Sequence, residues 1–520
     1  MSARRLAVEV VLDGPQPPAW QAGALDDLRR SRLIEVVAVR LLQSAAETPL
    51  RRAQARIERR LLGLGPDALA RVSAPGGAEH AGEIAPETPH GAAPPALSIW
   101  LAEQPPGERS IDTLHLRHAG CEQSADSAFT RAVIEGRDVV ESEFVLRRGD
   151  GQELLVERTF SGVRPFSLTL SRNLALWKLA AGVRRAAERL DGSPELQPAP
   201  PSANAGPAPS EGALLARSAV LWPRVLLTRL LFRRPWSLRV RRRALDPTQG
   251  WARPERLVDF SPGHLYADPM LFEHEGRHHL FCEEVRPGEG RAVISHTELR
   301  ADGRTAAPPS CVLERPYHLS YPFVFAHQGE LLMIPESSAM KRVELYRAVE
   351  FPTRWELDTV LIDQLDAADA TLLEHAGRLW LFVAVAAPHA SSLDELHLFS
   401  ASSLRGSWQP HPLNPVVSDV RCARPAGPVQ RWGSRLVRPG QDGSRRYGGA
   451  IAFCEIDELS ESAYGERQIA RLEPAALGGA RATHSYSSDS AFEAIDLRSR
   501  ELRSAGLPRM GLPMRRRRAL

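Results

Sequence analysis

Residues 267–284, ADPMLFEHEGRHHLFCEE, decide how the second half of this 520-residue chain folds. An apolar run leads into a polar turn that carries Gly276, and a second apolar run follows the turn. This order is typical of two antiparallel strands joined by a short loop, because glycine is a favoured turn residue. We therefore predict a β-hairpin centred on Gly276.

The same pattern returns at intervals of about 50 residues, a spacing that suits one four-stranded propeller blade. The later copies read SYPFVFAHQGELLMIPES, ADATLLEHAGRLWLFVAV and RPAGPVQRWGSRLVRPGQ. Their turn glycines are Gly329, Gly377 and Gly433. A weaker fifth unit, THSYSSDSAFEAID, begins at residue 483. The repeat predicts an all-β five-bladed β-propeller over residues 236–500.

Acidic side chains recur at matched distances from these turns. Eight residues before the four glycines stand Asp268, Tyr321, Asp369 and Pro425. Seven residues after them stand Glu283, Glu336, Ala384 and Gly440. Positions equally far from a hairpin turn lie side by side at its open end. Asp268 should therefore neighbour Glu283 or Glu284, and Tyr321 should neighbour Glu336. If these hairpins are the inner strands of their blades, several carboxylates share one mouth of the central channel.

Clustered carboxylates repel one another, so they persist only where arginine, a metal ion or a ligand offsets the repulsion. Their proton affinities are then pushed apart, and one pair can supply both an acid and a base. Sugar hydrolysis uses that combination. The fourth copy and the residues after it, with Arg424, Arg438 and Arg446, would give the basin cationic walls that could also hold a phosphate or carboxylate.

Each of these acids also has a purely structural explanation. An Asp before Pro often only accepts hydrogen bonds from the amides of a turn. A binding module that recognises a glycan or phosphorylated sugar without catalysis therefore stays open beside an enzyme. Two mouth carboxylates about 5 to 10 Å apart across an open pocket would favour an enzyme. Carboxylates tied to backbone amides or arginines in a plugged mouth would favour binding or scaffolding.

The first part of the chain has a different pattern. Apolar runs at residues 6–12 and 34–42 flank a helical stretch at 20–30. Strand, helix and strand in this order indicate a parallel α/β unit. We predict an α/β domain over residues 1–190, followed by a flexible linker rich in Pro, Ala and Ser over residues 191–213.

Residues 214–243 carry nine arginines and no acidic residue. An amphipathic helix on an anionic membrane has this character, and so does a helix that packs on its neighbour and runs into a strand at 236–240. We assign residues 214–235 as an Arg-rich amphipathic segment and leave both explanations open. Residues 501–520, which include four consecutive arginines, are expected to form a solvated basic tail.

Charge and cysteine usage limit the partners and the location. The formal net charge of +3 is too small for a chain of this size to indicate nucleic acid. The five cysteines form no CxxC pair, so neither a zinc site nor a disulfide framework is indicated. We expect a cytoplasmic protein, with a peripheral membrane contact as the open alternative, that needs no cofactor and no metal.

Several segments carry a resemblance to a known propeller. YADPMLFEHEGRHHLF, YPFVFAHQGELLMIPESS, VELYRAVEFPTRWEL, DATLLEHAGRLWLF and RLVRPGQDGSRRYG resemble the five-bladed domain at the N-terminus of plant glucosamine inositolphosphorylceramide transferases. They are similar, more distantly, to glycoside hydrolase family 43-type propellers. The resemblance covers roughly residues 235–500. The glycosyltransferase domain of the plant enzymes follows their propeller, and nothing comparable follows here, so we do not expect their transferase activity.

The resemblance implies a mechanism. In the hydrolase family the first-blade Asp before Pro is the general base, which makes Asp268 the base here. Glu336 is the candidate acid, and Asp369 is the candidate for adjusting the proton affinity of that acid. Both fit by position rather than by a full motif. Arg424 and Arg446 would orient a sugar or sugar-conjugate substrate. The candidates for substrate binding are Glu283, Tyr321, Arg424, Gln441, Asp442, Arg446, Tyr447 and His484.

The first segment, through VEVVLDG, the helix at Trp20 and the EVVAV run, is similar to a formyltransferase-like half that bacterial relatives carry ahead of the propeller. That similarity implies a bacterial protein. Formyl transfer in that family uses an Asn, His and Asp set, and Asn is absent from residues 1–172. We therefore expect a degenerate domain that is inactive by this route.

Overall fold

The structure is a computed structural model that describes residues 5–42, 48–73, 94–107, 109–191, 195–207, 209–233, 235–251, 261 and 263–502. The chain divides into two compact units. One is built mainly from residues 1–223 and the other mainly from residues 224–518. The weakly patterned stretch from Ser73 to Pro95 lies mostly outside the described residues.

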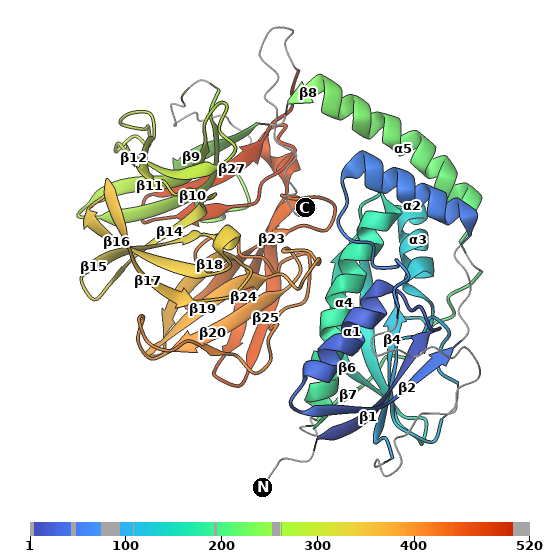
Figure 1. Ribbon diagram of the computed structural model, residues 1–520. Helices are drawn as coiled ribbons and strands as arrows, with labels where there is room; N and C mark the ends of the chain where they lie inside the picture. The colour runs from blue at the N-terminus through green and yellow to red at the C-terminus, as the bar shows by residue number, and fades with distance from the viewer. Residues whose placement is uncertain are drawn as a thin grey trace. The chain divides into compact units, whose positions relative to one another are not determined.

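The N-terminal unit is built on a seven-stranded sheet with the order β2-β1-β3-β4-β5-β6-β7 (Figure 1). Its strands are β1 (Leu6–Asp13), β2 (Ile34–Leu42), β3 (Leu97–Trp100), β4 (Thr113–His118), β5 (Val139–Arg147), β6 (Glu153–Gly162) and β7 (Gln197–Pro198). Strands β2, β1, β3 and β4 run parallel, and β4 to β7 alternate in direction. The sheet is therefore half parallel and half antiparallel.

The first, third and fourth helices of this unit pack on the sheet through buried apolar residues, whereas the second buries Gln54, Ala55 and Glu58. The helices are α1 (Ala19–Arg30), α2 (Pro49–Leu62), α3 (Ala125–Glu135) and α4 (Leu168–Asp191). Both α1 and α3 contact α4. Helix α3 begins where the Ser124 hydroxyl accepts a hydrogen bond from the Ser127 amide, and it ends at Gly136 in the left-handed conformation, as helix caps commonly do. Val10, Phe129 and Val183 lie in the shared core.

Part of the segment expected to be a flexible linker is held on the sheet. Gln197 and Pro198 form β7, which pairs with β6. The Ala203 amide donates to the Gly120 carbonyl, and Arg117 donates to the Pro200 carbonyl. Proline is tolerated here because β7 is an edge strand. The end of the expected linker, from Glu211, belongs to a helix.

That helix, α5 (Glu211–Leu231), contains most of the Arg-rich segment. Pro223 lies inside it. Several of its large apolar side chains are exposed, with Leu227 at 54% and Leu230 at 70%. Within the described part of the chain, no helix combines the length and the apolar character that crossing a bilayer requires.

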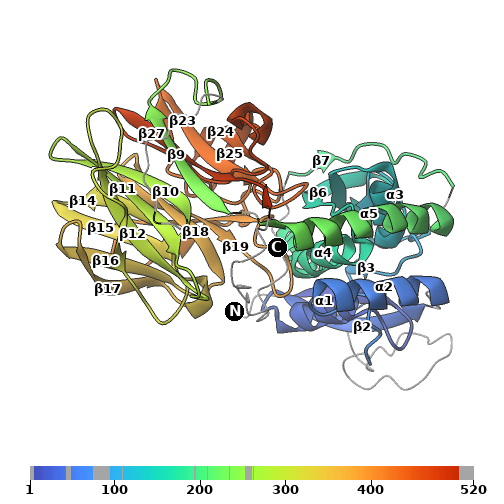
Figure 2. The same ribbon diagram turned by 90° about the horizontal axis from the view of Figure 1, so that it is seen from above.

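The second unit is a five-bladed β-propeller, as the repeat predicts (Figure 2). Four blades each take four consecutive strands. These are β10 (Leu265–His274) to β13 (Ser310–Leu313) with β11 (Arg277–Val285) and β12 (Ala292–Leu299); β14 (Ser320–His327), β15 (Glu330–Glu336), β16 (Val343–Glu350) and β17 (Arg354–Ile362); β18 (Ala367–His375), β19 (Arg378–Val385), β20 (Leu396–Ala401) and β21 (Gln409–Pro410); and β22 (Gln430–Trp432), β23 (Arg435–Asp442), β24 (Ala450–Leu459) and β25 (Tyr464–Leu472).

The fifth blade joins two distant parts of the chain. It has the order β26-β27-β9, with β26 (Tyr486–Ser488), β27 (Phe492–Arg498) and β9 (Trp236–Arg242). Strand β9 precedes the first blade in sequence and pairs antiparallel with β27, Val240 opposite Ala494. This pairing closes the ring of blades, because it gives both β27 and β9 a hydrogen-bonded neighbour.

A second short pairing lies beside the closure. Strand β28 (Glu501–Leu502) pairs with β8 (Phe232–Arg233). The expected basic tail therefore begins with a paired strand, and the rest of it, from residue 503, lies outside the described residues.

The turns between the first two strands of the first three blades share one geometry. Glu275 and Gly276 both have positive φ angles, 51° and 71°. Gln328 with Gly329 and Ala376 with Gly377 repeat this pair of positive angles. Two consecutive positive φ angles define the type I′ turn, whose twist matches that of the strands. Glycine is favoured at the second position of these three turns, whereas in the fourth blade Gly433 is the first loop residue between Trp432 and Arg435.

Candidate functional site

The residues that stand eight positions before the first three turn glycines each form a β-bulge. Asp268, Tyr321 and Asp369 have φ angles of 50°, 44° and 53°. Each lies at a register shift in the first strand of its blade. Residues other than glycine seldom adopt such angles, and a bulge leaves its residue outside the ladder and redirects its side chain. The repeat therefore places three side chains at equivalent points around the propeller axis.

The partner strands bring the second set of acids to the same end. Glu283 pairs with Ala267, and Glu336 pairs with Ser320. The expected neighbours of Asp268 and Tyr321 are thus displaced by one residue, because the bulge removes the bulged residues from the ladder. Strand β10 contacts β14, and β14 contacts β18. The first strand of each of these hairpins is therefore the innermost strand of its blade.

Asp268 is buried and held by several donors. The Ser485 hydroxyl donates to its Oδ1 at 2.6 Å, and the Tyr321 amide donates to its Oδ2 at 3.3 Å. Nε2 of His484 lies 3.1 Å from Oδ1. Burial alone would raise the pKa of this carboxyl, but His484 and Ser485 overcome it and lower the pKa to about 2. Asp268 is therefore ionised at neutral pH.

His484 is a buried imidazole between two carboxylates. Its Nδ1 lies 2.6 Å from Oδ2 of Asp496, and that aspartate is fully buried. Burial lowers the pKa of His484, yet Asp496 and Asp268 together raise it to about 10. The Asp496 carboxylate also accepts hydrogen bonds from the His484 and Ser485 amides. His484 is a fixed cation at neutral pH.

A second cluster forms around Arg424. Its guanidinium donates to both carboxylate oxygens of Asp369, at 2.6 and 3.1 Å, and to Glu336 at 3.0 Å. It also donates to the Ser392 hydroxyl at 3.1 Å. The side chains of Asp369 and Arg424 are 2% and 9% exposed. One buried arginine thus neutralises acids from two blades.

Gln441 completes this cluster. Its Nε2 donates to Asp369 at 2.7 Å and to the Pro425 carbonyl at 2.9 Å. Its Oε1 is buried and has no hydrogen-bond partner among the described residues. Because Asp369 and the Pro425 carbonyl both accept, the amide orientation is fixed. An unsatisfied acceptor therefore lies next to the Asp369 carboxylate.

Aromatic rings join the two clusters. The Tyr447 ring centre lies 4.7 Å from that of His484, and the Arg424 guanidinium lies 5.9 Å from the Tyr447 ring centre. Trp236, from the strand that closes the propeller, has its ring centre 4.5 Å from that of His484. Trp236 and Tyr447 are only partly buried. The two rings are the accessible edge of the site.

Most of the predicted site residues therefore come together, and some do not. The Glu283 carboxylate lies 3.1 Å from Nε2 of His318. The hydroxyl of Tyr321 bonds to Thr371 at 2.7 Å. Asp442 pairs with Arg471.

Arg446 is exposed, and the charged groups that act on it are Arg481, Arg445 and Glu473. The structure thus gives Asp442 and Arg446 charged neighbours of their own. Neither has a described contact with Asp268 or Asp369.

Sequence reasoning missed Asp496, Ser485, Ser392 and Trp236 as members of the site. Asp496 occupies a position comparable to that of Glu336. The Asp496 amide donates to the Ser485 carbonyl, and Glu336 pairs with Ser320 in the second blade. Asp496 thus stands in the fifth blade where Glu336 stands in the second. Trp236 gave no signal, because only ring closure brings it to residue 484.

One group in this site has the composition of a metal centre. Asp268, His484 and Asp496 each place a ligand atom within 4.8 Å of the others. A histidine must be neutral to ligate a metal, whereas the two aspartates keep His484 protonated. The contacts therefore indicate a buried group of three charged side chains, in which one histidine pairs with two aspartates.

The propeller is similar to a known family. The sequence profile described as glucosamine inositolphosphorylceramide transferase 1, N-terminal, matches residues 257–485. Glucosamine inositolphosphorylceramide transferase 1 of Arabidopsis thaliana is 33% identical over 214 residues, 40% of this chain and 28% of that protein. The protein of the same name from Oryza sativa subsp. japonica is 33% identical over 208 residues, 39% of this chain and 28% of that one. The chain spans less than a third of these curated relatives, and the resemblance predicted for the propeller is confirmed.

Solved structures with a similar strand arrangement include carbohydrate-acting enzymes. The α-L-arabinanase of Cellvibrio cellulosa complexed with arabinohexaose aligns with a TM-score of 0.31 and 13% identity, over 39% of this chain and 77% of that chain. An exo-β-1,3-galactanase from Clostridium thermocellum aligns with a TM-score of 0.29 and 11% identity, over 39% of this chain and 49% of that chain. The five-bladed fold itself follows from the strand pairing.

Proposed function

We propose that the propeller binds a sugar or sugar-conjugate at the mouth where the five inner hairpins meet. The observation that carries this proposal is that fixed partners hold each acid at the matched positions. His484 and Ser485 hold Asp268, and Arg424 holds both Asp369 and Glu336. Acids engaged in this way serve as positioned hydrogen-bond acceptors. The similarity to proteins named for glucosamine transfer supports a sugar-containing ligand.

The charge of the site supports an uncharged or amine-bearing sugar over a phosphorylated one. Besides Asp369, whose pKa burial raises, the described groups at the mouth include four acids, Asp268, Glu283, Glu336 and Asp496, against the two fixed cations His484 and Arg424. An added anion would be repelled by this excess of acid. A sugar could instead lie against Trp236 and Tyr447, donating hydroxyl hydrogen bonds to Glu336 and Gln441.

We expect Glu336→Gln to weaken binding by roughly tenfold or more, because a hydrogen bond to a charged group contributes about 1.5–3 kcal/mol. The measurement is glycan-array screening of the full chain, followed by calorimetry with the best uncharged sugar. Glu356→Gln is the matched control, since Glu356 is 61% exposed on β17. Equal affinities in the two variants would exclude Glu336 from the site.

Acid and base catalysis at the same mouth is the second candidate. It is favoured by carboxyls whose pKa values move in opposite directions. The pKa of Asp268 is lowered to about 2, while burial raises the pKa of Asp369 well above its usual range despite Arg424. Such separation is the pattern of an acid and base pair. Catalysis would be established if the wild-type chain releases a product from the bound glycan and the variants Asp268→Asn and Glu336→Gln do not. A bound glycan that the wild-type chain leaves intact would exclude catalysis.

We further propose that α5 contacts an anionic membrane surface, which would bring the propeller to lipid-linked sugars. The helix exposes apolar side chains, among them Val220, Leu226, Leu227, Leu230 and Leu231. Residues 214–243 contain no acid. Exposed apolar groups interspersed with arginine are what an interfacial helix presents to anionic lipid.

Leu230→Asp should reduce sedimentation of the full chain with vesicles that contain phosphatidylserine by about tenfold, because a buried leucine contributes about 1.5–3 kcal/mol. Leu357→Asp is the matched control, as Leu357 is 45% exposed on propeller strand β17. Binding that is indifferent to anionic lipid would reject the membrane contact.

The formyltransferase-like nature of the N-terminal unit, its bacterial origin and a cytoplasmic location stay proposals. The lack of Asn in residues 1–172 supports an N-terminal unit that does not transfer formyl groups.

A further inference from the structure

The N-terminal unit contains a pocket of its own, at the carboxyl ends of the parallel strands β3 and β4. Trp20 and Trp100 supply apolar walls, and His115 and Gln123 are among the polar lining. The pocket opens to solvent, and its empty space of about 560 Å³ includes that open part. Open α/β sheets bind ligands at this edge of their parallel strands.

His115 lines this pocket, and neither of its ring nitrogens makes a well-formed hydrogen bond. Its side chain is 1% exposed, and within the described residues only the Thr113 backbone acts on the ring as a hydrogen-bonding group, without the geometry of a normal bond. The carboxylate of Glu153 is 3.9 Å from Nε2, beyond hydrogen-bonding distance. A buried polar group without a partner costs about 1–3 kcal/mol, so the fold bears this cost unless a ligand supplies the partner.

Gln123 adds a second unsatisfied group. Its Nε2 donates to the His118 carbonyl at 2.9 Å, while its Oε1 is buried without a partner in the described part of the chain. Because the His118 carbonyl can only accept, the amide cannot be turned over to satisfy Oε1. The pocket therefore contains a free acceptor and an imidazole without a well-formed hydrogen bond.

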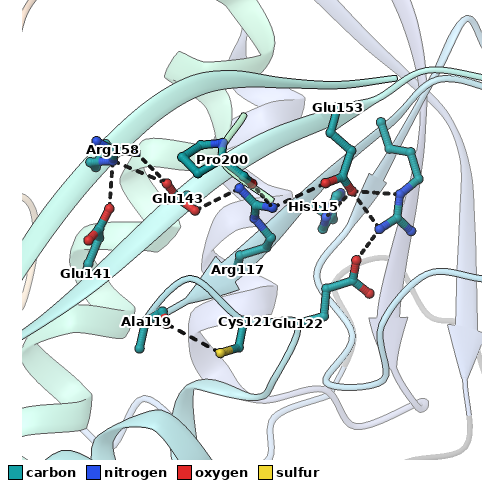
Figure 3. Close-up of polar contacts among 11 residues, drawn as sticks. His115, Arg117, Ala119, Cys121, Glu122, Glu141, Glu143, Glu153, Arg158 and Pro200 are labelled. Carbon is teal, nitrogen blue, oxygen red and sulfur yellow. Dashed lines mark hydrogen bonds and ion pairs between the residues drawn. The ribbon is translucent and has the colours of Figure 1, made fainter. Parts of the chain in front are cut away.

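A metal ion is a poor occupant of this pocket. His115, Glu122 and Glu153 place ligand atoms within 4.8 Å of one another. Arg147, however, pairs with both carboxylates. Arg117 also donates to Glu153, at 3.2 Å, as Figure 3 shows. The two guanidinium groups already neutralise the acids. A divalent cation would be repelled by both of them.

An anion is also a poor occupant. Burial, with a smaller effect of Arg147, lowers the pKa of His115 to about 4, so its ring is neutral at pH 7. The described lining includes the acids Glu103, Glu122 and Asp126 and no lysine or arginine. A neutral imidazole offers one N–H donor and one acceptor nitrogen, which suits a ligand group that both donates and accepts.

We infer that this pocket binds an uncharged sugar. A hydroxyl both donates and accepts, so it satisfies His115 in either tautomer and Gln123 Oε1 as well. The apolar face of the ring lies against Trp20 and Trp100. This site belongs to the N-terminal unit, and it does not depend on the function proposed for the mouth of the propeller.

Hydrogen exchange on the full chain tests this inference, because exchange in β3, β4 and α3 reports on this pocket alone. The probes are D-glucose, D-mannose and N-acetyl-D-glucosamine, each compared with D-glucose 6-phosphate. An uncharged sugar at about ten times its Kd should slow exchange in these elements about tenfold. His115→Leu and Gln123→Met should each abolish that protection. Glu336→Gln, in the propeller, should leave it unchanged.

The sugar-free variants separate binding from structure. Without sugar, β4 should exchange no faster in His115→Leu than in the wild type, because the variant removes a buried group that had no well-formed hydrogen bond. Faster exchange would show that His115 stabilises the fold and would overturn the inference. No protection by any of the uncharged sugars, or equal protection by D-glucose 6-phosphate, would overturn it as well.

Discussion

Replacement of Arg424 by methionine should lower the free energy of unfolding of the propeller by about 3–5 kcal/mol, because it leaves buried carboxylates without their cation. Arg424 holds Asp369 through two hydrogen bonds and Glu336 through one. Asp369 is 2% exposed, so water cannot replace the guanidinium. Asp369, whose pKa burial already raises, would then lie beside Glu336 with no cation to favour its charged form.

The matched control is Arg405→Met. Arg405 also binds two acids, Asp358 and Glu330, but its side chain is 41% exposed. Exposed ion pairs contribute about 0–1 kcal/mol, so this variant should lose little. Urea unfolding followed by tryptophan fluorescence measures both. A loss for Arg424→Met no larger than that for Arg405→Met would contradict the buried neutralisation described here.

The propeller should lose stability as the pH rises from about 6.5 to about 10. The pKa of His484 is near 6.5 in the unfolded chain, and the folded propeller raises it to about 10. Its contribution is therefore complete below pH 6.5 and disappears as the pH rises through 10. A difference of this size corresponds to a loss on the order of 3–5 kcal/mol. Asp268 acts at the other extreme, since its lowered pKa of about 2 makes its contribution disappear as the pH falls from about 4 to 2.

Urea midpoints at pH 6.5, 8 and 9.5 measure the alkaline loss. His484→Gln should be less stable at pH 6.5 and should show a much flatter dependence up to pH 9.5. His296→Gln is the control, because burial lowers the pKa of His296 to about 3 and the ring is already neutral throughout this range. The same alkaline slope in His484→Gln and the wild type would show that His484 is not the titrating group.

The site was predictable where the repeat carries it. Asp268, Tyr321 and Asp369 stand eight residues before turn glycines, and the structure gives all three the same bulge. Counting from the turn also placed Glu336 beside this set. The count worked because strands of equal length on either side of a type I′ turn have a fixed register.

The structure gives some of the predicted residues partners from outside the hairpins. Asp442 lies in the fourth blade and was expected to line the basin, yet it pairs with Arg471 from the outer strand β25. Arg446 follows β23 in a loop and lies among Arg445, Arg481 and Glu473. Spacing along the chain does not encode which neighbouring strand supplies a countercharge.

The sequence by itself determined the hairpins, their number and the end of each at which the acids gather, because turn chemistry and alternation act over a few residues. Only the tertiary structure decided which charges meet. His484 finds Asp268 across more than two hundred positions, and Trp236 reaches His484 through the β9 closure. Coulomb interaction and desolvation depend on distance in space and on burial, and circular stacking of the blades sets both.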